Sequence, residues 1–182
     1  MMIKSKIFIL RPYRKWDEKS LIENINDRNV SKFMSKVPYP YTMKDAKKWV
    51  NECRKSNKNK TALSFAIDIG GKIIGGIGLM NIEKRMAELG YWLGKKYWNK
   101  GIMTEAVKLV TNLGFKKLKL GRIYATIFVK NRASAKALEN NGYKFEGLMK
   151  KYYVKNHPSE MGSMFALFDN KSVVFDARNY TI

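Results

Sequence analysis

The chain has 182 residues, 45% of them hydrophobic and 28% charged, values that fit one folded, soluble domain spanning residues 1–182. No apolar run approaches the roughly 20 residues of a membrane span, no cleavable export signal is evident, and the single cysteine excludes an internal disulfide, so we expect a cytoplasmic protein without membrane contact. The 36 Lys and Arg against 15 Asp and Glu give a net charge of +21, which leaves three explanations open: a solvated basic surface, attraction of an anionic cofactor, or contact with nucleic acid or the ribosome.

The first sixty residues predict a strand, two helices and a loop. Residues 7–11 have the pattern of a short strand, and residues 16–25 have the apolar spacing of a helix. Residues 35–41 contain two prolines and must form a loop. Thr42, followed three residues later by Asp45, resembles a capping box that starts the second helix. The apolar stripes consist of Trp16, Leu21, Ile22 and Ile25 in the first helix and of Ala46, Trp49, Val50 and Cys53 in the second, so Cys53 is expected to serve packing.

The middle of the chain predicts the centre of a sheet. Residues 63–69 and 72–79 are rich in β-formers and flank Gly70-Gly71, which is a strong hairpin signal. Residues 86–93 supply the next strand. A long amphipathic helix follows, with Ile102, Ala106, Leu109, Val110 and Leu113 on one face. Residues 122–129 then return as a buried strand beside residues 86–93, which makes a strand-helix-strand crossover.

The last part of the chain predicts a short helix and two strands. The helix covers residues 133–140 and ends at Asn141-Gly142. Residues 143–154 and 163–168 have the pattern of a final strand pair. The fold class is therefore α/β with a mixed sheet, without internal repeats or a low-complexity linker.

The stretch ELGYWLGKKYWNKGIMTEA, residues 88–106, predicts a strand, a short loop and the beginning of a helix. A helix N-terminus presents unpaired backbone N–H groups and the positive end of the helix dipole. Gly101 lies at that point, where a missing side chain lets phosphate oxygens approach the backbone. One glycine after a strand is weak evidence alone, since it also serves a simple turn.

The neighbouring segments make the pattern specific. The strand IYATIFVKN and the segment NRASAKALENNGYKFEG follow at helix-length distance, and ILRPYRKWD precedes. In order, spacing and residue type, residues 88–147 resemble the GNAT superfamily of N-acetyltransferases, in particular its RimJ/RimL-type branch. The resemblance implies a mixed, mostly antiparallel central sheet with a splayed parallel strand pair and flanking helices, and acetyl-CoA as the cosubstrate.

The resemblance also implies a set of cofactor-binding residues. The pantetheine arm is expected along Tyr91, Trp92, Leu93 and Gly94, and the pyrophosphate on Asn99, Lys100, Gly101, Ile102, Met103 and Thr104. Asn131 and Ser134 match the N-x-x-S pattern of the branch and are expected beside the pantetheine and the thioester. Both residue types also cap helices, so capping is an alternative role.

Three positions depart from the superfamily pattern. The loop usually reads Gln/Arg-x-x-Gly-x-Gly/Ala, whereas this chain has Trp98 at the first position and Met103 at the last. A related branch carries a proton-donating tyrosine in the short helix, where this chain has Leu138. These departures keep open a catalytically degenerate acyl-CoA-binding module as an alternative to an enzyme.

Acetyl transfer requires a neutral amine, stabilisation of an oxyanion and a proton for the departing thiolate. We expect backbone N–H groups near Leu93 and Gly94 to stabilise the oxyanion and Glu88, directly or through water, to take up the amine proton. Ser134, Tyr152 or Tyr153 would protonate the thiolate, and we expect Ser134, Tyr153 and Glu88 to be the catalytic residues. His157, the single histidine, fits a surface turn better.

The expected acceptor is a primary amine, either a protein N-terminal α-amine or a small molecule such as a polyamine, amino acid or antibiotic. With one Cys and one His, the chain offers no usual transition-metal site. A ribosomal protein is a possible partner, and an RNA- or ribosome-associated basic protein is the second alternative function. Both a monomer and a homodimer are compatible with the sequence.

Overall fold

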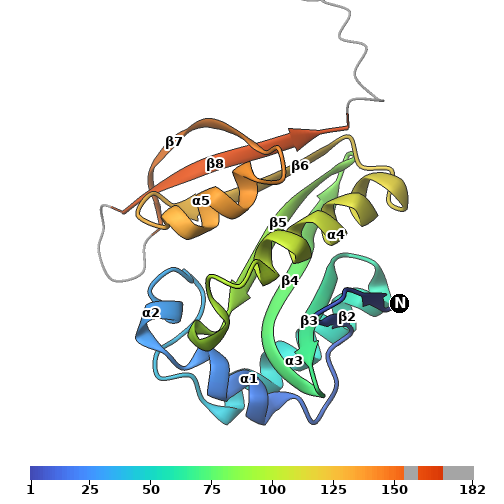
Figure 1. The fold of residues 1–182 in the computed structure, drawn as a ribbon, viewed down its shortest axis with the longest axis vertical. Coiled ribbons are helices and arrows are strands. Elements are labelled where there is room, and N and C mark those ends of the chain that lie inside the picture. Colours follow the sequence, from blue (N-terminus) through green and yellow to red (C-terminus); the bar gives the residue numbers. More distant parts are fainter. Residues whose placement is uncertain (154–159, 170–182) are drawn as a thin grey trace, which may run out of the picture.

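The protein folds around one eight-stranded sheet in the order β1-β2-β3-β4-β5-β6-β8-β7 (Figure 1). The computed structural model describes residues 1–153 and 160–169, with side chains for 1–150 and 162–169. The strands are β1 (Ile3–Lys4), β2 (Ile9–Arg11), β3 (Leu63–Ile69), β4 (Lys72–Glu83), β5 (Met86–Leu93), β6 (Arg122–Phe128), β7 (Lys144–Tyr153) and β8 (Glu160–Phe168). The helices are α1 (Glu18–Ile25), α2 (Arg28–Ser31), α3 (Met43–Asn59), α4 (Ile102–Lys116), α5 (Arg132–Glu139) and the 3-10 turn η1 (Lys95–Tyr97). The mixed, mostly antiparallel α/β sheet with flanking helices expected from the sequence is confirmed.

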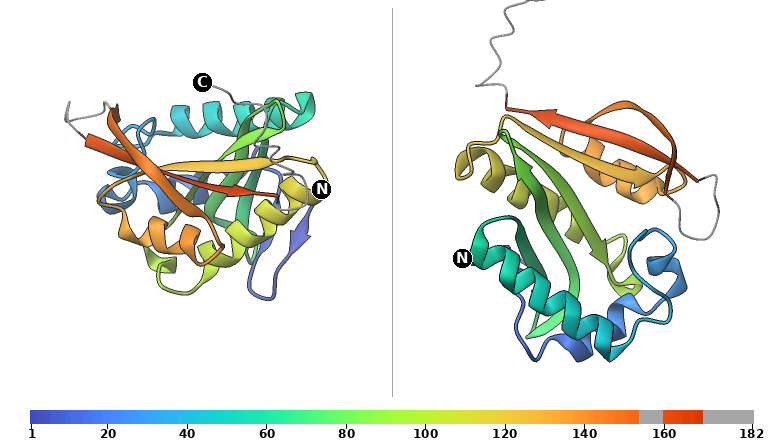
Figure 2. Two further views of the ribbon diagram at one scale, coloured as in Figure 1. Left: turned by 90° about the horizontal axis from the view of Figure 1, so that it is seen from above. Right: turned by 180° about the vertical axis from the view of Figure 1, so that it is seen from behind.

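Helices cover both faces of the sheet (Figure 2). α4 packs on one face, where Phe65 and Ile67 of β3 point, and α1 and α3 pack on the other, where Ala66 points. Successive residues of a strand face opposite sides, so β3 is buried along nearly its whole length because both faces are covered.

The N-terminal elements differ from the sequence prediction in three details. β2 covers only the last three residues of the predicted strand. The two-residue strand β1, which was not predicted, pairs with it. α1 begins at Glu18 rather than at residue 16, and Trp16, assigned to the apolar stripe, is 73% exposed. That assignment was wrong because Trp16 lies in the loop before the helix, outside the helical spacing. The short helix α2 was not predicted.

The start of α3 confirms the predicted capping box. The Asp45 N–H donates to the Thr42 hydroxyl, 3.3 Å away, and the Thr42 N–H donates to the Asp45 carboxylate, 2.9 Å away. Cys53 is buried in the core between α3 and the sheet, as expected, and burial raises the pKa of its thiol to about 12. Cys53 therefore serves packing.

The predicted hairpin between β3 and β4 is confirmed. Gly70 and Gly71 have φ angles of 59° and 83°, which glycine adopts without the steric cost that a side chain brings. β4 runs four residues further than predicted, to Glu83, and pairs with β5 in antiparallel register.

The two central strands part after a short parallel contact. β5 and β6 are in register at only three positions, from Met86 opposite Arg122 to Glu88 opposite Tyr124. Beyond Glu88, β6 continues beside β8 while β5 stays with β4, so the strands diverge (Figure 1). The splayed parallel pair implied by the family resemblance is therefore confirmed, and its opening leaves the last residues of β5 without a paired strand on the side of β6.

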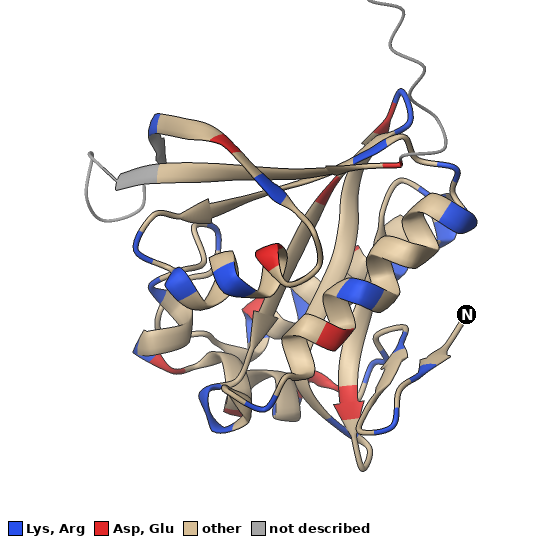
Figure 3. Ribbon diagram, turned by 45° about the horizontal axis from the view of Figure 1, so that its top comes forward, with Lys and Arg blue, Asp and Glu red and all other residues tan. Residues whose placement is uncertain are grey.

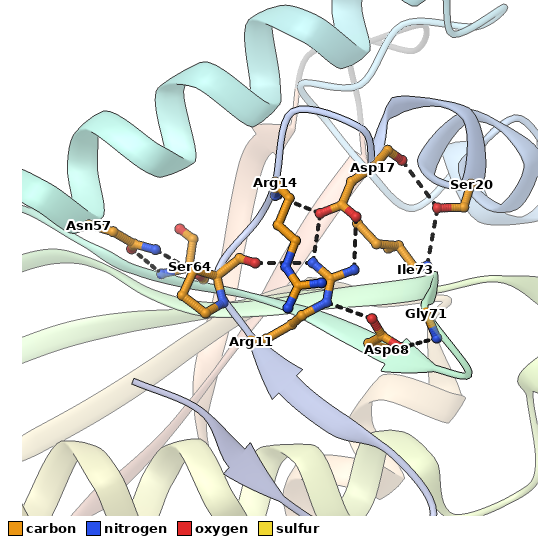
Figure 4. Close-up of polar contacts among 10 residues, drawn as sticks. Arg11, Arg14, Asp17, Ser20, Asn57, Ser64, Asp68, Gly71 and Ile73 are labelled. Carbon is orange, nitrogen blue, oxygen red and sulfur yellow. Dashed lines mark hydrogen bonds and ion pairs between the residues drawn. The ribbon is translucent and has the colours of Figure 1, made fainter.

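A buried ion-pair cluster holds β2, β3 and the start of α1 together (Figure 4). The Arg11 guanidinium donates to both carboxylate oxygens of Asp17 at 2.7 and 2.8 Å and to Asp68 at 2.5 Å. All three side chains are at most 7% exposed, so each charge depends on the others for stabilisation. The cluster also fixes the loop between β2 and α1, because the Arg14 N–H donates to Asp17.

Candidate active site

A cleft of about 360 Å³ opens where β5 and β6 part. Its walls come from the end of β5, the loop and first turn of α4, the first turns of α5, and the segment around α2. Among the described residues, Lys100 and Lys136 are the charged side chains that line it, and no Asp or Glu of that part of the chain does. The cleft is therefore suited to an elongated anionic ligand with apolar parts.

The loop before α4 forms the anion-binding end of the cleft. Gly101 is the residue before the helix, with φ of 71°, and a β-carbon built on it would meet no atom within 4 Å. The open backbone there leads to the N–H groups of Ile102, Met103 and Thr104 in the first turn of α4. A 15-residue helix adds the positive end of its dipole, so the loop has a backbone geometry that suits an anion, and its binding of phosphate stays a prediction.

The Trp98 side chain anchors the loop before α4 to the end of β5. Its indole N–H donates to the Leu93 carbonyl at 2.8 Å, which ties the loop back to the end of β5. Met103, the second departure from the family pattern, is half-buried and packs against the core. Both departures therefore have structural roles that leave the backbone of the loop open.

The first turn of α5 lies on the other side of the cleft. The Asn131 side chain accepts from the Ser134 N–H at 3.1 Å, so Asn131 caps the helix, as the alternative interpretation held, while it also lines the cleft. The Tyr91 hydroxyl donates to the Ser134 carbonyl at 3.2 Å and joins β5 to α5. Burial raises the pKa of Tyr91 above the ordinary value of 10.0, so this phenol is a hydrogen-bond donor at neutral pH and well above it.

A second, smaller cavity of about 60 Å³ adjoins the cleft. Gly90 of β5 and Thr126 of β6 contribute to its walls, on the two diverging strands. The residues that line both cavities are Phe33, Tyr91, Asn131 and Ser134. These four residues, which we call the junction, mark the place where ligands in the two cavities would meet.

The structure brings together most of the predicted site. Every predicted cofactor-binding residue except Gly94 lines the larger cleft. The Gly94 N–H donates to the Ile74 carbonyl at 2.8 Å, so it is not open to an oxyanion as the sequence suggested. Glu88 lines neither cavity, and its carboxylate accepts from the Asn81 amide at 3.0 Å. The side chains of Tyr152, Tyr153 and His157 lie outside the described residues.

Sequence reasoning missed the contribution of α2 and the residues after it. Asn29, Val30, Phe33 and Met34 form one wall of the larger cleft. Their only sequence signal was their position before the proline-containing loop, because a four-residue helix has too short a pattern to detect. Lys136 and Asn140, which follow Ser134 along the chain, also line the larger cleft.

The described part of the chain contains neither a metal-binding cluster nor a membrane-spanning helix. Among residues 1–153 and 160–169, no group of three or more His, Cys, Asp and Glu side chains is arranged to hold a metal ion. In the same residues, no helix is both long and apolar enough to cross a membrane.

Comparison with known proteins identifies the family of the chain. The family model of the acetyltransferase (GNAT) domain matches residues 8–144. The chain belongs to this family. Members of the GNAT family are acetyl-CoA-dependent N-acetyltransferases, so the protein is an enzyme of that class.

The relatives agree with this assignment over most of the chain. "Probable N-acetyltransferase YjcK" of Bacillus subtilis (strain 168) is 32% identical over 158 residues, which cover 82% of this chain and 87% of that protein. The crystal structure of a GNAT-family acetyltransferase from Bacillus anthracis superposes with a TM-score of 0.80 at 27% identity, covering 92% of this chain and 98% of that one. A ribosomal-protein-S5-alanine acetyltransferase from Vibrio fischeri shares the fold, with a TM-score of 0.82 at 24% identity and coverage of 93% and 97%.

The residues of this GNAT cleft fit the cosubstrate of the family. Acetyl-CoA has a polyanionic end and a slender arm that contains two amide groups. The open backbone at Gly101 and the cations Lys100 and Lys136 suit the first, and the end of β5, which has no strand beside it after Glu88 on the side of β6, suits the second. Lys and Arg are spread over many helices, strands and loops of the molecule (Figure 3).

Proposed function

We propose that the protein transfers an acetyl group from acetyl-CoA to a primary amine by direct attack, and that the acceptor is the α-amine of a peptide or protein N-terminus. The observation that carries the proposal is the junction. The larger cleft and the smaller cavity meet at four shared residues, so a thioester held along β5 and an amine in the smaller cavity reach the same place.

The larger cleft would hold acetyl-CoA through two kinds of group. Backbone N–H groups from Gly101 to Thr104, with Lys100, would bind the pyrophosphate, and the backbone of β5 from Tyr91 to Leu93 would pair with the pantetheine arm. Bound there, acetyl-CoA supplies the activated acetyl group. The protein's own contribution is orientation and proton transfer.

The size of the smaller cavity favours a slim acceptor. About 60 Å³ accommodates the head of a primary amine and little more. A peptide N-terminus entering end on meets this limit, and so does a linear polyamine, which remains the competing acceptor. The V. fischeri protein of similar fold is named as an acetyltransferase of an alanine of ribosomal protein S5, which supports a ribosomal protein as the partner.

Proton balance also favours an α-amine. Deprotonating an α-amine of pKa about 7.7–8.0 at pH 7 costs about 1 kcal/mol, whereas a lysine amine of pKa about 10.4 costs nearly 5 kcal/mol. Glu88 is the proposed base. Glu88 is half-buried and lies two residues before Gly90, which lines the smaller cavity, so both residues are on the same face of β5. The Glu88 carboxylate would take up the proton of an amine in that cavity through water.

Ser134 is the proposed group that protonates the departing thiolate. It lies at the junction, and its N–H and carbonyl are held by Asn131 and Tyr91, which fixes the residue at the mouth of both cavities. Leu138, which replaces the tyrosine of a related branch, is fully buried and has no acidic proton to give. Tyr153 remains the alternative donor on β7.

A thiol-release assay with acetyl-CoA tests the proposal. The panel contains peptides with different N-terminal residues, the same peptides with blocked N-termini and an internal lysine, polyamines and aminoglycosides. We expect release only with free N-termini, and a loss of turnover in Ser134→Ala with unchanged CoA binding by calorimetry. Release with polyamines alone would refute the acceptor assignment. Tight CoA binding without release for any amine would instead identify a degenerate binding module.

A further inference from the structure

The Thr126 hydroxyl is a buried polar group that makes no hydrogen bond within the described part of the chain. Four buried side-chain nitrogen or oxygen atoms of that part lack a partner, and Thr126 Oγ1 is the one from the wall of the smaller cavity. A buried hydroxyl without a partner destabilises the folded state, because it has lost its hydrogen bonds to water and gained none. A ligand in the adjoining cavity can supply the missing partner.

Thr126 lies where β6 has parted from β5 (Figure 1). The parallel register ends with Glu88 opposite Tyr124, and Gly90 and Thr126 each come two residues after that pair. Residues two apart on a strand point to the same face, so Thr126 lies on the same face of the sheet as Glu88, the proposed base. On its other side β6 stays paired with β8, where Met164 is opposite Thr126. The opening between the strands is therefore on the side of Gly90, which has no side chain.

The other polar side chains of this cavity are already bonded or assigned. The Asn131 side-chain oxygen accepts from the Ser134 N–H at 3.1 Å, and the Tyr91 hydroxyl donates to the Ser134 carbonyl at 3.2 Å. Ser134 itself is the proposed proton donor to the thiolate. Among the described residues, no charged side chain lines the cavity, which favours a neutral amine over an ammonium ion. Thr126 therefore remains as the group of the described wall that can hold the nitrogen.

We propose that the Thr126 hydroxyl holds the acceptor amine by accepting a hydrogen bond from the N–H that the amide product keeps. This inference rests on the proposed function, because it assigns one contact within the same site. In the transfer, the nitrogen lone pair forms the C–N bond and the C–S bond breaks. One N–H proton passes through water to Glu88, and Ser134 gives a proton to the thiolate and regains one from water. A hydroxyl bonded to the second N–H leaves the lone pair free to attack the thioester.

This contact distinguishes primary from secondary amines. A primary amine keeps one N–H when it becomes an amide, whereas a secondary amine, such as an N-terminal proline, loses its last one. With a secondary amine the Thr126 hydroxyl stays buried without a partner, and a site built to hydrogen-bond a group rejects an analogue that lacks it. We therefore expect a peptide that begins with proline to react more slowly than one that begins with alanine.

The test is the isosteric variant Thr126→Val, which replaces the hydroxyl by a methyl group. Loss of one hydrogen bond should lower kcat/KM for a peptide with N-terminal alanine about two- to thirteenfold in the thiol-release assay. The KM for acetyl-CoA should change little, because Thr126 does not line the larger cleft. Thr126→Ser keeps the hydroxyl and should keep most of the rate. The urea midpoint of Thr126→Val should be no lower than that of the wild type, since the change removes an unpartnered hydroxyl.

Thr111→Val is the matched control. The Thr111 hydroxyl is also buried, but it is hydrogen-bonded to the Tyr143 hydroxyl at 2.8 Å, and Thr111 lines neither cavity. This variant should lower the urea midpoint and leave kcat/KM for the peptide at the wild-type value. The same chemical change is thus expected to affect rate at one threonine and stability at the other.

The outcomes separate this inference from the proposed function. Wild-type kcat/KM in Thr126→Val, an equal loss in Thr126→Ser or Thr111→Val, or equal rates for the alanine and proline peptides would overturn the role of Thr126 and leave acetyl transfer intact. If the wild type releases thiol with polyamines alone, the same variants are compared with spermidine. If it releases thiol with no amine, the proposed function fails, and calorimetry of the alanine peptide with the CoA-bound protein decides about Thr126. Weaker binding in Thr126→Val then supports the contact, and equal affinity or no binding overturns it.

Discussion

Tyr91→Phe removes a single hydrogen bond at the junction of the two cavities. The Tyr91 hydroxyl donates to the Ser134 carbonyl, and this contact is a direct side-chain link between the end of β5 and the first turn of α5. Phenylalanine keeps the ring and its packing. The variant therefore tests whether the link positions Ser134 for acetyl transfer.

The expected magnitude follows from the strength of one neutral hydrogen bond. Such a bond contributes about 0.5–1.5 kcal/mol. If the link is fully used in the transition state, its loss lowers kcat/KM by about two- to thirteenfold, since each 1.36 kcal/mol corresponds to a factor of ten. We expect the fall in kcat, because the phosphate socket around Gly101 lies outside the link and the KM for acetyl-CoA should change little.

Tyr143→Phe is the matched control. Tyr143 is also a buried tyrosine, and its hydroxyl makes a 2.8 Å hydrogen bond with Thr111, but it lines neither cavity. Its loss leaves a buried threonine without a partner and should cost about 1–3 kcal/mol of unfolding free energy. Initial rates of thiol release and urea unfolding are measured for both variants. Wild-type kcat in Tyr91→Phe, or an equal loss of kcat in Tyr143→Phe, would refute the positioning role.

Three further predictions concern the loop, the buried charges and the helix cap. Gly101→Ala places a side chain at φ of 71°, which should cost about 1–2 kcal/mol of stability and weaken CoA binding measured by calorimetry. The control Gly71→Ala, at φ of 83° in the hairpin, should cost similar stability but leave the CoA affinity intact. Equal CoA affinities of the two variants would argue against the phosphate socket. Arg11→Met leaves two buried carboxylates without their cation and should lower the unfolding free energy by about 3–5 kcal/mol in urea titrations. A loss below about 1 kcal/mol would contradict the buried ion-pair cluster. Thr42→Ala should cost about 0.5–2 kcal/mol at pH 7. The hydrogen bonds from Thr42 lower the pKa of Asp45 below its usual 3.8, so the part of this cost that comes from the Asp45 carboxylate is complete above that value and fades as the pH falls through the lowered pKa. The hydrogen bond from the Asp45 N–H to the Thr42 hydroxyl does not depend on that ionisation, so the rest of the cost persists; a cost that does not fall at all at the lowest pH would contradict the part of the carboxylate in the capping box.

Local patterns in the sequence were enough to predict the features that depend on neighbouring residues. Gly70-Gly71 indicated the hairpin because only glycine readily takes its φ angles. Thr42 and Asp45 indicated the start of α3 because the capping box joins residues three positions apart. The segment from Glu88 to Ala106 indicated the phosphate socket, and Asn131 to Ser134 the first turn of α5, because their order and spacing are those of the GNAT family.

Only the tertiary structure decided which of these residues meet. Phe33 joins the junction because the chain after α2 folds back against β5 and α5, a long-range contact that no local pattern encodes. The Gly94 N–H is engaged because β4 lies beside it, which its own segment does not reveal. Trp16 is exposed because α1 starts two residues later than its apolar spacing suggested. The sequence by itself determined the family and its cosubstrate, whereas the junction follows from packing between distant segments.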